Sequence, residues 1–277
     1  MAHCYQQVRT QSPLAEYAGL AVYESKQRLE ALESQSADAY MEEEMSILTK
    51  PYMQTGNAHL LPIDMNDPAL ALYLPLWYPH GDMTGSPIYS YDKNRHAGTV
   101  TGATWGYQGR TFDGTDDRIN CGDKAVFNLT DAITLMAWIN VTTDVGYAGV
   151  IAKGTAGGYY LLDLDAGGDY ARANWVGVSG AHPVVDNTVE LINGTWYLIG
   201  WSYDRQNSRL WVNGVNVQTD PQTEAILSAT GGSLLIGEDF SGAADFNGII
   251  GDCWLYNRVL TLAEIQHIYN ATKWRYV

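Results

Sequence analysis

Two aspartates in the middle of the sequence have a spacing that could support hydrolysis of a glycosidic bond. Asp163 and Asp165 alternate along a strand-like segment, so both carboxylates would project from one face of it. Glycoside hydrolysis needs two carboxylates, roughly 5–10 Å apart, beside the bond that breaks. The turn residues at 166–169 follow at once, however, and favour an exposed hairpin end over a catalytic pair.

The remaining acidic residues offer no better arrangement for catalysis. From residue 66 onward the sequence has four glutamates, which are Glu190, Glu224, Glu238 and Glu264. No two of them occupy alternate positions of one strand-like run. A Gly-x-Ser-x-Gly nucleophile motif and a glycine-rich phosphate loop are both missing from the sequence. We therefore predict that the protein is not an enzyme.

Carboxylates in two predicted loops could instead bind calcium. A hard divalent cation prefers several oxygen ligands from a loop. The candidate ligands are Asp113, Asp116, Asp117, Glu238 and Asp239. Aspartate and glycine are also ordinary residues of tight turns, and neither loop has a regular ligand spacing. Turn formation is thus the simpler explanation, and calcium is the cofactor that stays open beside it.

Aromatic residues of the central segments are candidate contacts for a sugar. Tyrosine and tryptophan combine an apolar ring face with a group that can hydrogen-bond, and ligand sites pair such faces with a few polar partners. The candidate glycan-binding residues are Tyr147, Tyr159, Tyr160, Tyr170 and Trp175. Four other tryptophans lie within regular strand-like runs and are expected in the core, namely Trp138, Trp196, Trp201 and Trp254.

Composition and charge narrow the class of protein. The 277 residues include 31 acidic and 16 basic side chains, a formal net charge of −15, and 46% of them are hydrophobic. This balance is typical of a folded chain rather than a disordered one. It excludes a general nucleic-acid binder, which needs an excess of cations to neutralise phosphate. The longest uncharged apolar run, about residues 69–79, is too short to insert across a membrane.

The N-terminus and the cysteines provide information on the cellular location of the protein. The first residues lack the basic and apolar regions of a secretory signal peptide. Because particles assembled inside a cell can be released later, the expected location is the surface of a virion or another extracellular particle. Three cysteines cannot form a complete disulfide framework. We expect Cys121 and Cys253 to be buried thiols.

From about residue 66 the sequence has the pattern of an all-β domain. Short strand-like runs alternate with turn residues, and Asn213-Gly214, which joins two runs, is the strongest hairpin signal. Many strands without intervening helices predict a two-sheet antiparallel jelly-roll sandwich over residues 66–277. Thr261 and Glu264 have the spacing of a capping box, which predicts a short C-terminal helix.

Residues 1–65 differ in composition and are predicted to form a helical arm followed by a linker. Ser12-Pro13 is a typical helix start, and Pro51 ends the helix-favouring stretch. The apolar stripe of this segment is too thin to fold alone, so it needs contacts with another subunit or a scaffold. The expected assembly contacts are Leu14, Tyr17, Val22, Leu29, Leu32, Met41, Met45 and Leu48.

Several segments, taken in order, resemble the laminin-G-like, concanavalin-A-like jelly-roll family. FDGTDD at 112–117 is similar to the family's F-D-G-x-D-D turn, TLMAWI at 134–139 to its T-x-x-A-W-I/V strand, and LWVNG at 210–214 to its L-Y-V-N-G hairpin. The resemblance covers about residues 66–272. It implies a mostly non-catalytic domain, since family members bind glycans, proteins or calcium, or serve as structural modules. Gly251-Asp252 departs from the family's Asp-Glu, which weakens any carboxylate function at that edge.

These observations predict a non-enzymatic structural or display protein of a virus or phage particle, for instance a capsid decoration or a fibre. Its arm would join other subunits, as a homo-oligomer, and its exposed lectin-like domain could bind host-surface glycans. The arm, the acidity and the missing signal peptide favour this class. Leu70–Trp105 also resembles jelly-roll domains encoded in tailed-phage and environmental viral sequences. The alternative is a free extracellular, glycan-binding, lectin-like protein.

Overall fold

The computed structural model describes residues 64–78, 86–143, 146–186 and 188–277. The chain divides into two units, Met1–Leu61 and Pro62–Val277, and the described residues all lie in the second. The predicted arm and its eight expected assembly contacts fall outside the described residues. The domain boundary near residue 65 therefore stays a prediction.

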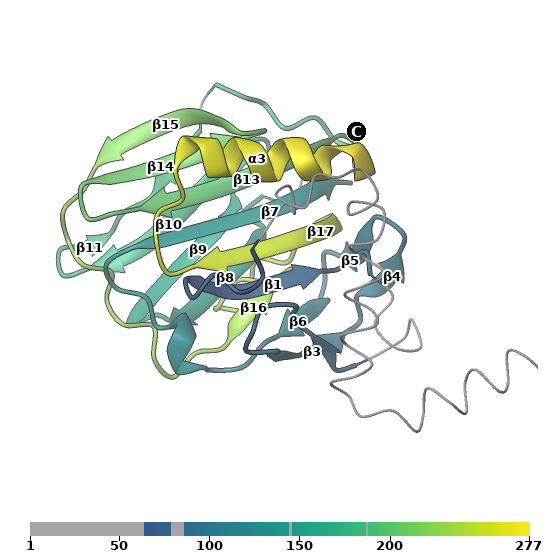
Figure 1. The fold of residues 1–277 in the computed structure, drawn as a ribbon, viewed down its shortest axis with the longest axis horizontal. Coiled ribbons are helices and arrows are strands. Elements are labelled where there is room, and N and C mark those ends of the chain that lie inside the picture. The colour runs from purple at the N-terminus through teal and green to yellow at the C-terminus, as the bar shows by residue number, and fades with distance from the viewer. Residues whose placement is uncertain (1–63, 79–85, 144–145, 187) are drawn as a thin grey trace, which may run out of the picture. The chain divides into compact units, whose positions relative to one another are not determined.

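Two antiparallel β-sheets form the described body (Figure 1). The first sheet has the strand order β15-β14-β13-β7-β17-β5-β4, and β1 also pairs with β17. The second has the order β11-β10-β9-β8-β16-β6-β3-β2, and β12 also pairs with β10. The recorded strand pairs are all antiparallel. This confirms the predicted all-β jelly-roll sandwich.

The bounds of the elements follow from the backbone pairing. The first sheet contains β1 (Leu70–Pro75), β4 (Thr104–Gly106), β5 (Gly109–Asp113), β7 (Ile133–Val141), β13 (Trp196–Tyr203), β14 (Asn207–Val212), β15 (Val215–Pro221) and β17 (Asn247–Tyr256). The second contains β2 (Ile88–Tyr89), β3 (Ala97–Thr101), β6 (Arg118–Asn120), β8 (Gly149–Thr155), β9 (Gly158–Leu164), β10 (Ala171–Gly177), β11 (Gly180–Ala181), β12 (Val184–Val185) and β16 (Leu234–Ile236). The helix α3 (Leu262–Thr272) follows β17, and short 3-10 helices cover η1 (Ala125–Phe127) and η2 (Lys273–Arg275).

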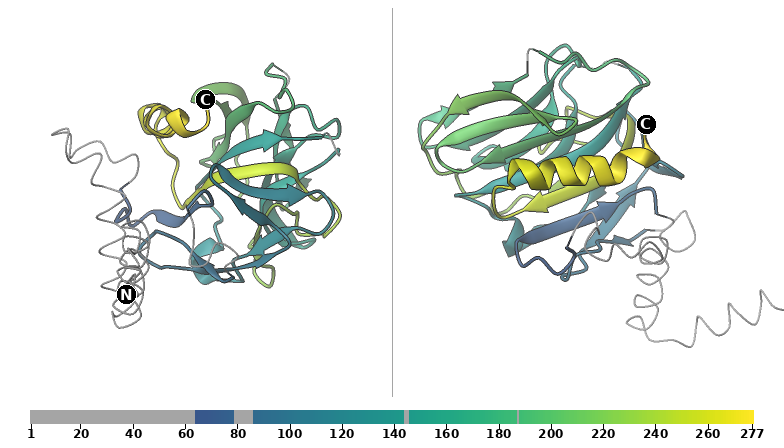
Figure 2. Two further views of the ribbon diagram at one scale, coloured as in Figure 1. Left: turned by 90° about the vertical axis from the view of Figure 1, so that its right-hand side faces the viewer. Right: turned by 45° about the horizontal axis from the view of Figure 1, so that its top comes forward.

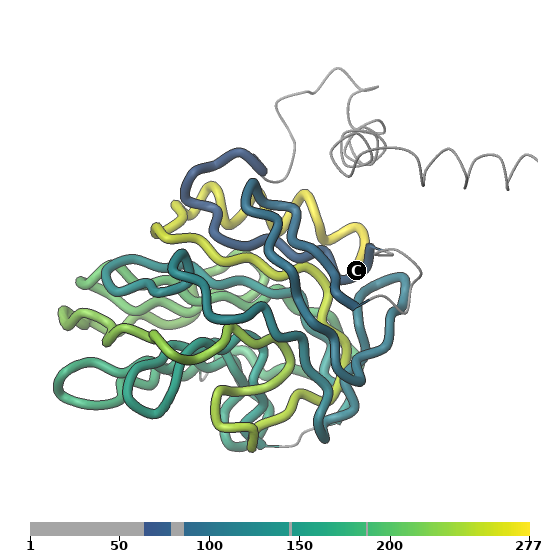
Figure 3. The backbone as a smooth tube through the Cα atoms, turned by 90° about the horizontal axis from the view of Figure 1, so that it is seen from below, coloured from purple at the N-terminus to yellow at the C-terminus, as the bar shows by residue number. Residues whose placement is uncertain are grey.

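The main core lies between the two sheets. Side chains alternate along a strand, so in β7 Leu135 and Ile139 join this core while Met136 and Trp138 point to the opposite face. That opposite face is buried as well, because α3 lies across it (Figures 1 and 2). In the edge-on view of Figure 3 the helix can be followed on one side of the strands. The four tryptophans expected in the core, Trp138, Trp196, Trp201 and Trp254, are all buried.

The helix α3 is fixed to the first sheet by an aromatic stack and a hydrogen bond. The rings of Trp138 and Tyr269 lie 5.7 Å apart at 23°, and the indole N–H of Trp138 donates to Thr272 Oγ1 at 2.8 Å. Thr261 and Glu264 form the predicted capping box at the start of the helix. In the part of the chain that the structure describes, no helix is long and apolar enough to cross a membrane.

The predicted hairpin at Asn213-Gly214 is present between β14 and β15. Both residues have positive φ, 50° at Asn213 and 78° at Gly214. Positive φ at both central residues is the requirement of a tight two-residue hairpin turn, and Asn-Gly meets it with the least strain. The sequence signal therefore had a direct backbone cause.

Cys121 and Cys253 are free thiols on the two facing sheets. Cys121 follows β6 of the second sheet, Cys253 lies in β17 of the first, and both are fully buried. Burial raises the pKa of Cys121 to about 12, and it also raises the pKa of Cys253. The expectation of two buried thiols is confirmed.

One lysine of the second sheet is buried completely. Lys153, on β8, donates through Nζ to Asp123 Oδ1 at 2.8 Å and to the carbonyl of Ala229 at 2.7 Å, and a third bond goes to the carbonyl of Gly232. An ammonium has three N–H donors, and here each of them has an oxygen partner. The charge thus ties the loop at 229–232 to β8.

Candidate functional site

The outer face of the second sheet carries a polar and aromatic surface on β9 and β10. In β10 burial alternates strictly, so Arg172 and Asn174 point away from the core. The strand register places Arg172 opposite Asp163 and Asn174 opposite Leu161. The pairing of two neighbouring strands therefore brings a cation, a carboxylate and an amide to one patch.

Tyr147 and Asp163 hold Arg172 from two sides. The guanidinium carbon of Arg172 lies 4.2 Å from the centre of the Tyr147 ring. Its Nε donates to Asp163 Oδ1 and Oδ2 at 3.0 and 3.1 Å, and its Nη2 also bonds Oδ2. Tyr147 keeps 49% of its surface exposed. Its ring is therefore backed by a fixed cation and remains open to solvent.

Asp163 is buried under this arrangement. It is only 2% exposed, which corrects the expectation that Asp163 lies at an exposed hairpin end. The physical reason is the pairing with Arg172 on the adjacent strand, which lets the carboxylate remain on a covered part of the sheet. Burial raises the pKa of Asp163 to about 7, against the lowering effect of Arg172, and the nearby Asp239 and Asp165 add to the rise.

A second aromatic pair lies beside this group. Tyr159 of β9 stacks on Phe240 with ring centres 4.4 Å apart at 25°. The amide of Asn174 donates to the Tyr159 hydroxyl at 3.2 Å, whereas Asn174 Oδ1 is buried and has no hydrogen-bond partner. We call Tyr147, Tyr159, Arg172, Asn174 and Phe240 the tyrosine surface.

The structure separates the five aromatic residues that the sequence analysis proposed for sugar binding. Tyr147 and Tyr159 belong to the tyrosine surface, and Tyr170 is half-buried beside it, with its backbone N–H donated to Asp165 Oδ1. Tyr160 and Trp175 are fully buried. The expectation that these two are exposed stacking surfaces is therefore wrong. They oppose each other in the register of β9 and β10 and point into the core, one position away from the outward-facing residues.

Arg172, Asn174 and Phe240 were missed by the sequence analysis. One signal could have found the first two. The runs at 159–165 and 171–178 flank a turn, and pairing them as a hairpin places Arg172 opposite Asp163. Phe240 comes from a loop far along the sequence, and no short-range pattern predicts its contact with Tyr159.

The acidic residues proposed as calcium ligands do come together. One oxygen each from Asp113, Asp116 and Asp117 lies within 4.8 Å of the others. The loop at 238–245 lies next to them, because Arg118 Nε is 3.5 Å from Glu238 Oε2 and Asn247 Nδ2 donates to the carbonyl of Asp113 at 2.9 Å. The two loops thus form one acidic cluster, which also supplies Phe240 to the tyrosine surface.

Electrostatics in the acidic cluster favour a cation. Burial raises the pKa of Asp117, Glu238 and Asp245, and the neighbouring carboxylates raise each of them further. A divalent ion with oxygen ligands would relieve this repulsion. The same side chains also form turns: Asp113 Oδ1 accepts from the Thr115 N–H and Asp239 Oδ1 from the Ser241 N–H. The geometry fits both explanations, and calcium binding stays a prediction.

Another polar group lies at the end of β10 and is not a catalytic triad. Ser179 Oγ and Glu224 Oε2 both lie 3.3 Å from His182 Nε2. A triad needs the carboxylate on one imidazole nitrogen and the hydroxyl on the other, so that the ring can pass a proton. With both partners on Nε2 this relay cannot operate.

Asp252 is a structural centre that the sequence analysis did not recognise. It is fully buried, and its oxygens accept bonds from the Tyr73 hydroxyl, the Trp77 indole, Arg275 and the Tyr276 hydroxyl at 2.8–2.9 Å. All its acceptor positions are therefore used within the fold. Asp252 therefore has a structural role within the fold.

A sequence model of a known family matches the body. The model is described as the concanavalin A-like lectin/glucanases superfamily, and it matches residues 113–266. A search of curated proteins found no relative with significant sequence similarity.

Solved structures with a similar fold come from toxins and from an arabinanase. The binding domain of botulinum neurotoxin serotype G has a TM-score of 0.54 at 12% identity, over 72% of this chain and 50% of that one. The binding domain of Paraclostridial mosquitocidal protein 1 has a TM-score of 0.55 at 12% identity, over 75% of this chain and 53% of that one. This chain thus spans about half the length of these toxin domains.

Domain 4 of AbnA, a GH43 extracellular arabinanase from Geobacillus stearothermophilus, was solved in complex with arabinotriose. It has a TM-score of 0.55 at 15% identity, over 72% of this chain and 98% of that one. At these identities the similarity concerns the fold.

Proposed function

The chain belongs to the concanavalin A-like lectin/glucanase superfamily, and we propose that it is a lectin-like protein that binds glycans through the tyrosine surface. The observation that carries this proposal is the exposed ring of Tyr147 on the fixed guanidinium of Arg172. The C–H face of a sugar ring can pack on an exposed aromatic ring such as this one. Because Arg172 already fixes the Tyr147 ring, little conformational entropy is lost when a sugar binds.

Hydrogen-bonding groups beside the ring support the same proposal. Tyr159 and Asn174, which bond each other, are both half-buried at this surface. The surface thus combines an apolar ring face with hydroxyl and amide groups, the mixture that ligand sites use. A binding role also agrees with the superfamily's fold and with the arabinotriose complex of the arabinanase domain.

A glycan array followed by titration tests this function. We expect the full chain to bind members of the array, and Tyr147→Ala to weaken the best of them by about tenfold or more. Tyr89→Ala is the matched control, because Tyr89 is 44% exposed and has the Arg95 guanidinium 5.8 Å above its ring, on β2 at the other edge of the same sheet. Equal losses in both variants, or no binding by the unmodified chain, would contradict the proposal.

The proposed role is non-enzymatic. Asp163, the carboxylate that contacts the tyrosine surface, is engaged by Arg172, and the Ser179, His182 and Glu224 group lacks triad geometry. Glycans that bind should therefore be recovered intact. Release of new reducing ends that disappears in Asp163→Asn would overturn this part.

We further propose that residues 1–65 attach the lectin-like body to a virus or phage particle, with host-surface glycans as its targets. The division of the chain at residue 61, the acidity of the protein and the composition of the first segment support this role. Size measurement and co-purification compare the full chain with residues 62–277. We expect loss of oligomer and of particle association in the shorter chain, with glycan binding kept. A monomeric full chain without a particle partner would instead favour a free extracellular lectin.

Calcium is the proposed ligand of the acidic cluster. Its support is the proximity of Asp113, Asp116 and Asp117 and the raised pKa of Asp117. Millimolar calcium should raise the melting temperature of the protein, and magnesium should do so less, because the loop oxygens suit a larger ion. Asp116→Asn should reduce the calcium shift. An unchanged melting temperature with both ions would leave the cluster as turn structure alone.

A further inference from the structure

We infer that the tyrosine surface selects uncharged glycans, and that Asp163 sets this selectivity by neutralising Arg172. The inference rests on the proposed glycan-binding function and specifies its ligand class. Arg172 is the cation of the surface, and an unpaired arginine beside an aromatic ring would attract the carboxylate of an acidic sugar. The arrangement around it disfavours this option in two ways.

The first is the occupation of the guanidinium. An arginine recognises a carboxylate best through two parallel N–H donors. In Arg172 the donors of one edge, Nε and Nη2, both bond Asp163, and the face of the group lies on Tyr147. A ligand carboxylate at this edge would have to displace a buried protein carboxylate, which has the advantage of being covalently held in place.

The second is the sign of the surrounding charge. The Arg172 and Asp163 charges cancel, and Asp165 and Asp239 lie close enough to raise the pKa of Asp163. Asp239 also acts on Glu238 and Asp245, which links the surface to the acidic cluster. An anionic ligand would therefore enter a region of net negative potential and be repelled.

The test uses an array of paired glycans that share a neutral core and differ in a sialic acid or a uronic acid. At about pH 8, where Asp163 is mainly ionised, we expect the full chain to prefer the neutral member by about tenfold or more. Asp163→Asn should lower this preference by about tenfold, because Arg172 then carries an uncompensated charge. Asp204→Asn is the matched control, since Asp204 pairs with Arg209 at 2.8 Å on the first sheet, and its preference should equal that of the unmodified chain.

A second variant guards against a simple folding defect. Arg172→Gln removes the cation, so its residual binding should keep the preference for neutral glycans. A preference that is lost in Asp163→Asn and kept in Arg172→Gln cannot come from a common loss of structure. Equal or tighter binding of the acidic members by the unmodified chain, or an unchanged preference in Asp163→Asn, would overturn the inference alone. Absence of binding to every glycan would overturn the proposed function as well.

Discussion

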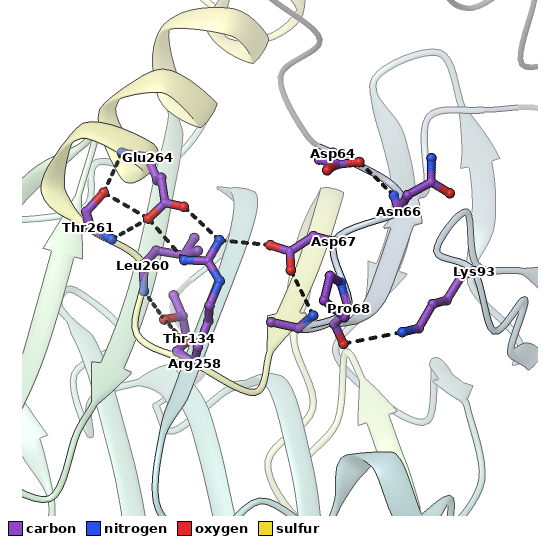
Figure 4. A network of polar contacts seen from close by, with 11 residues as sticks. Asp64, Asn66, Asp67, Pro68, Lys93, Thr134, Arg258, Leu260, Thr261 and Glu264 are labelled. Atoms are coloured by element: carbon purple, nitrogen blue, oxygen red, sulfur yellow. Dashed lines mark hydrogen bonds and ion pairs between the residues drawn. The ribbon is translucent and has the colours of Figure 1, made fainter.

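Asp67 and Arg258 are 191 residues apart in the sequence, and their side chains meet at 2.8 Å (Figure 4). Arg258 follows β17, and Asp67 precedes β1, the strand that pairs with β17. The same guanidinium bonds both carboxylate oxygens of Glu264, at 3.0 and 2.7 Å. One arginine therefore joins the first described strand to the capping box of α3.

Substitution of Arg258 should lower the stability of the body. We expect Arg258→Met to lower the free energy of unfolding by about 1 kcal/mol, because the group is partly exposed and bidentate pairing adds only moderately to stability there. The measurement is urea denaturation. Arg205→Met, which removes an exposed pair with Asp131, is the control and should have a smaller effect. An equal effect of the two changes would contradict the prediction, because the junction would then contribute no more than an ordinary exposed ion pair.

The junction should also shape acid stability. Hydrogen bonds from Arg258, and then from Thr261, lower the pKa of Glu264 to about 2. A depressed carboxyl pKa contributes stability above the unfolded value of 4.5, and this contribution is lost as the pH falls toward 2. Glu264→Gln should therefore flatten the pH dependence of the melting temperature within that window. If the pH dependence of the melting temperature were unchanged in Glu264→Gln, the attribution of this acid sensitivity to Glu264 would be wrong.

Asp163 should affect the pH dependence of stability in the direction opposite to that of Glu264. Its pKa is raised from 3.8 to about 7, so the folded state binds the proton more tightly than the unfolded state. Its contribution is fully present below pH 3.8 and is lost as the pH rises through about 7. Asp163→Asn should remove this part of the decline in stability between these values. If the decline in stability were unchanged in Asp163→Asn, other groups would be its cause.

The same titration should change ligand selectivity. The charged or titratable groups that act on Asp163 or belong to the surface are Arg172, Asp165, Asp239, Tyr147 and Tyr159. Protonation of Asp163 leaves Arg172 without its counter-charge, so binding of sialylated glycans should increase as the pH falls below about 7. Titration calorimetry at several pH values measures this. Asp163→Asn should bind such glycans equally on both sides of the transition.

The clearest stability effect should come from Lys153. Its removal in Lys153→Met leaves the buried carbonyls of Ala229 and Gly232 without donors, and we expect a loss of about 3 kcal/mol. Asp123→Asn changes only the solvent-exposed partner and should cost much less. A similar loss in both variants would mean that the ion pair, and not the satisfaction of the carbonyls, stabilises the loop.

Local patterns in the sequence were sufficient wherever one short segment decides the structure. Asn213-Gly214 predicted its hairpin, and the spacing of Thr261 and Glu264 predicted the capped helix, because backbone geometry at these points depends on neighbouring residues. The order of the family-like segments was enough for the jelly roll.

The register of a strand could not be predicted in the same way. Tyr159 and Tyr160 are adjacent, and a shift by one position decides which of them reaches the surface. Contacts between residues far apart in the sequence could not be predicted either. Examples are the contact of Phe240 with Tyr159 and that of Arg258 with Asp67. Candidate binding residues therefore needed the three-dimensional pairing of β9 with β10.

The two buried cysteines make the opening of the sandwich measurable without an added label. The thiolate is the group that attacks a thiol-specific reagent. At Cys121 and Cys253 the raised pKa keeps the thiolate scarce, and burial keeps the reagent away until the sheets separate. In a Cys4→Ser background, each modification event would then count one separation of the layers. One thiol belongs to each sheet, so the labelling rates of Cys121 and Cys253 can be compared. Equal rates would mean that the sandwich opens as a whole. Unequal rates would identify the sheet that opens first.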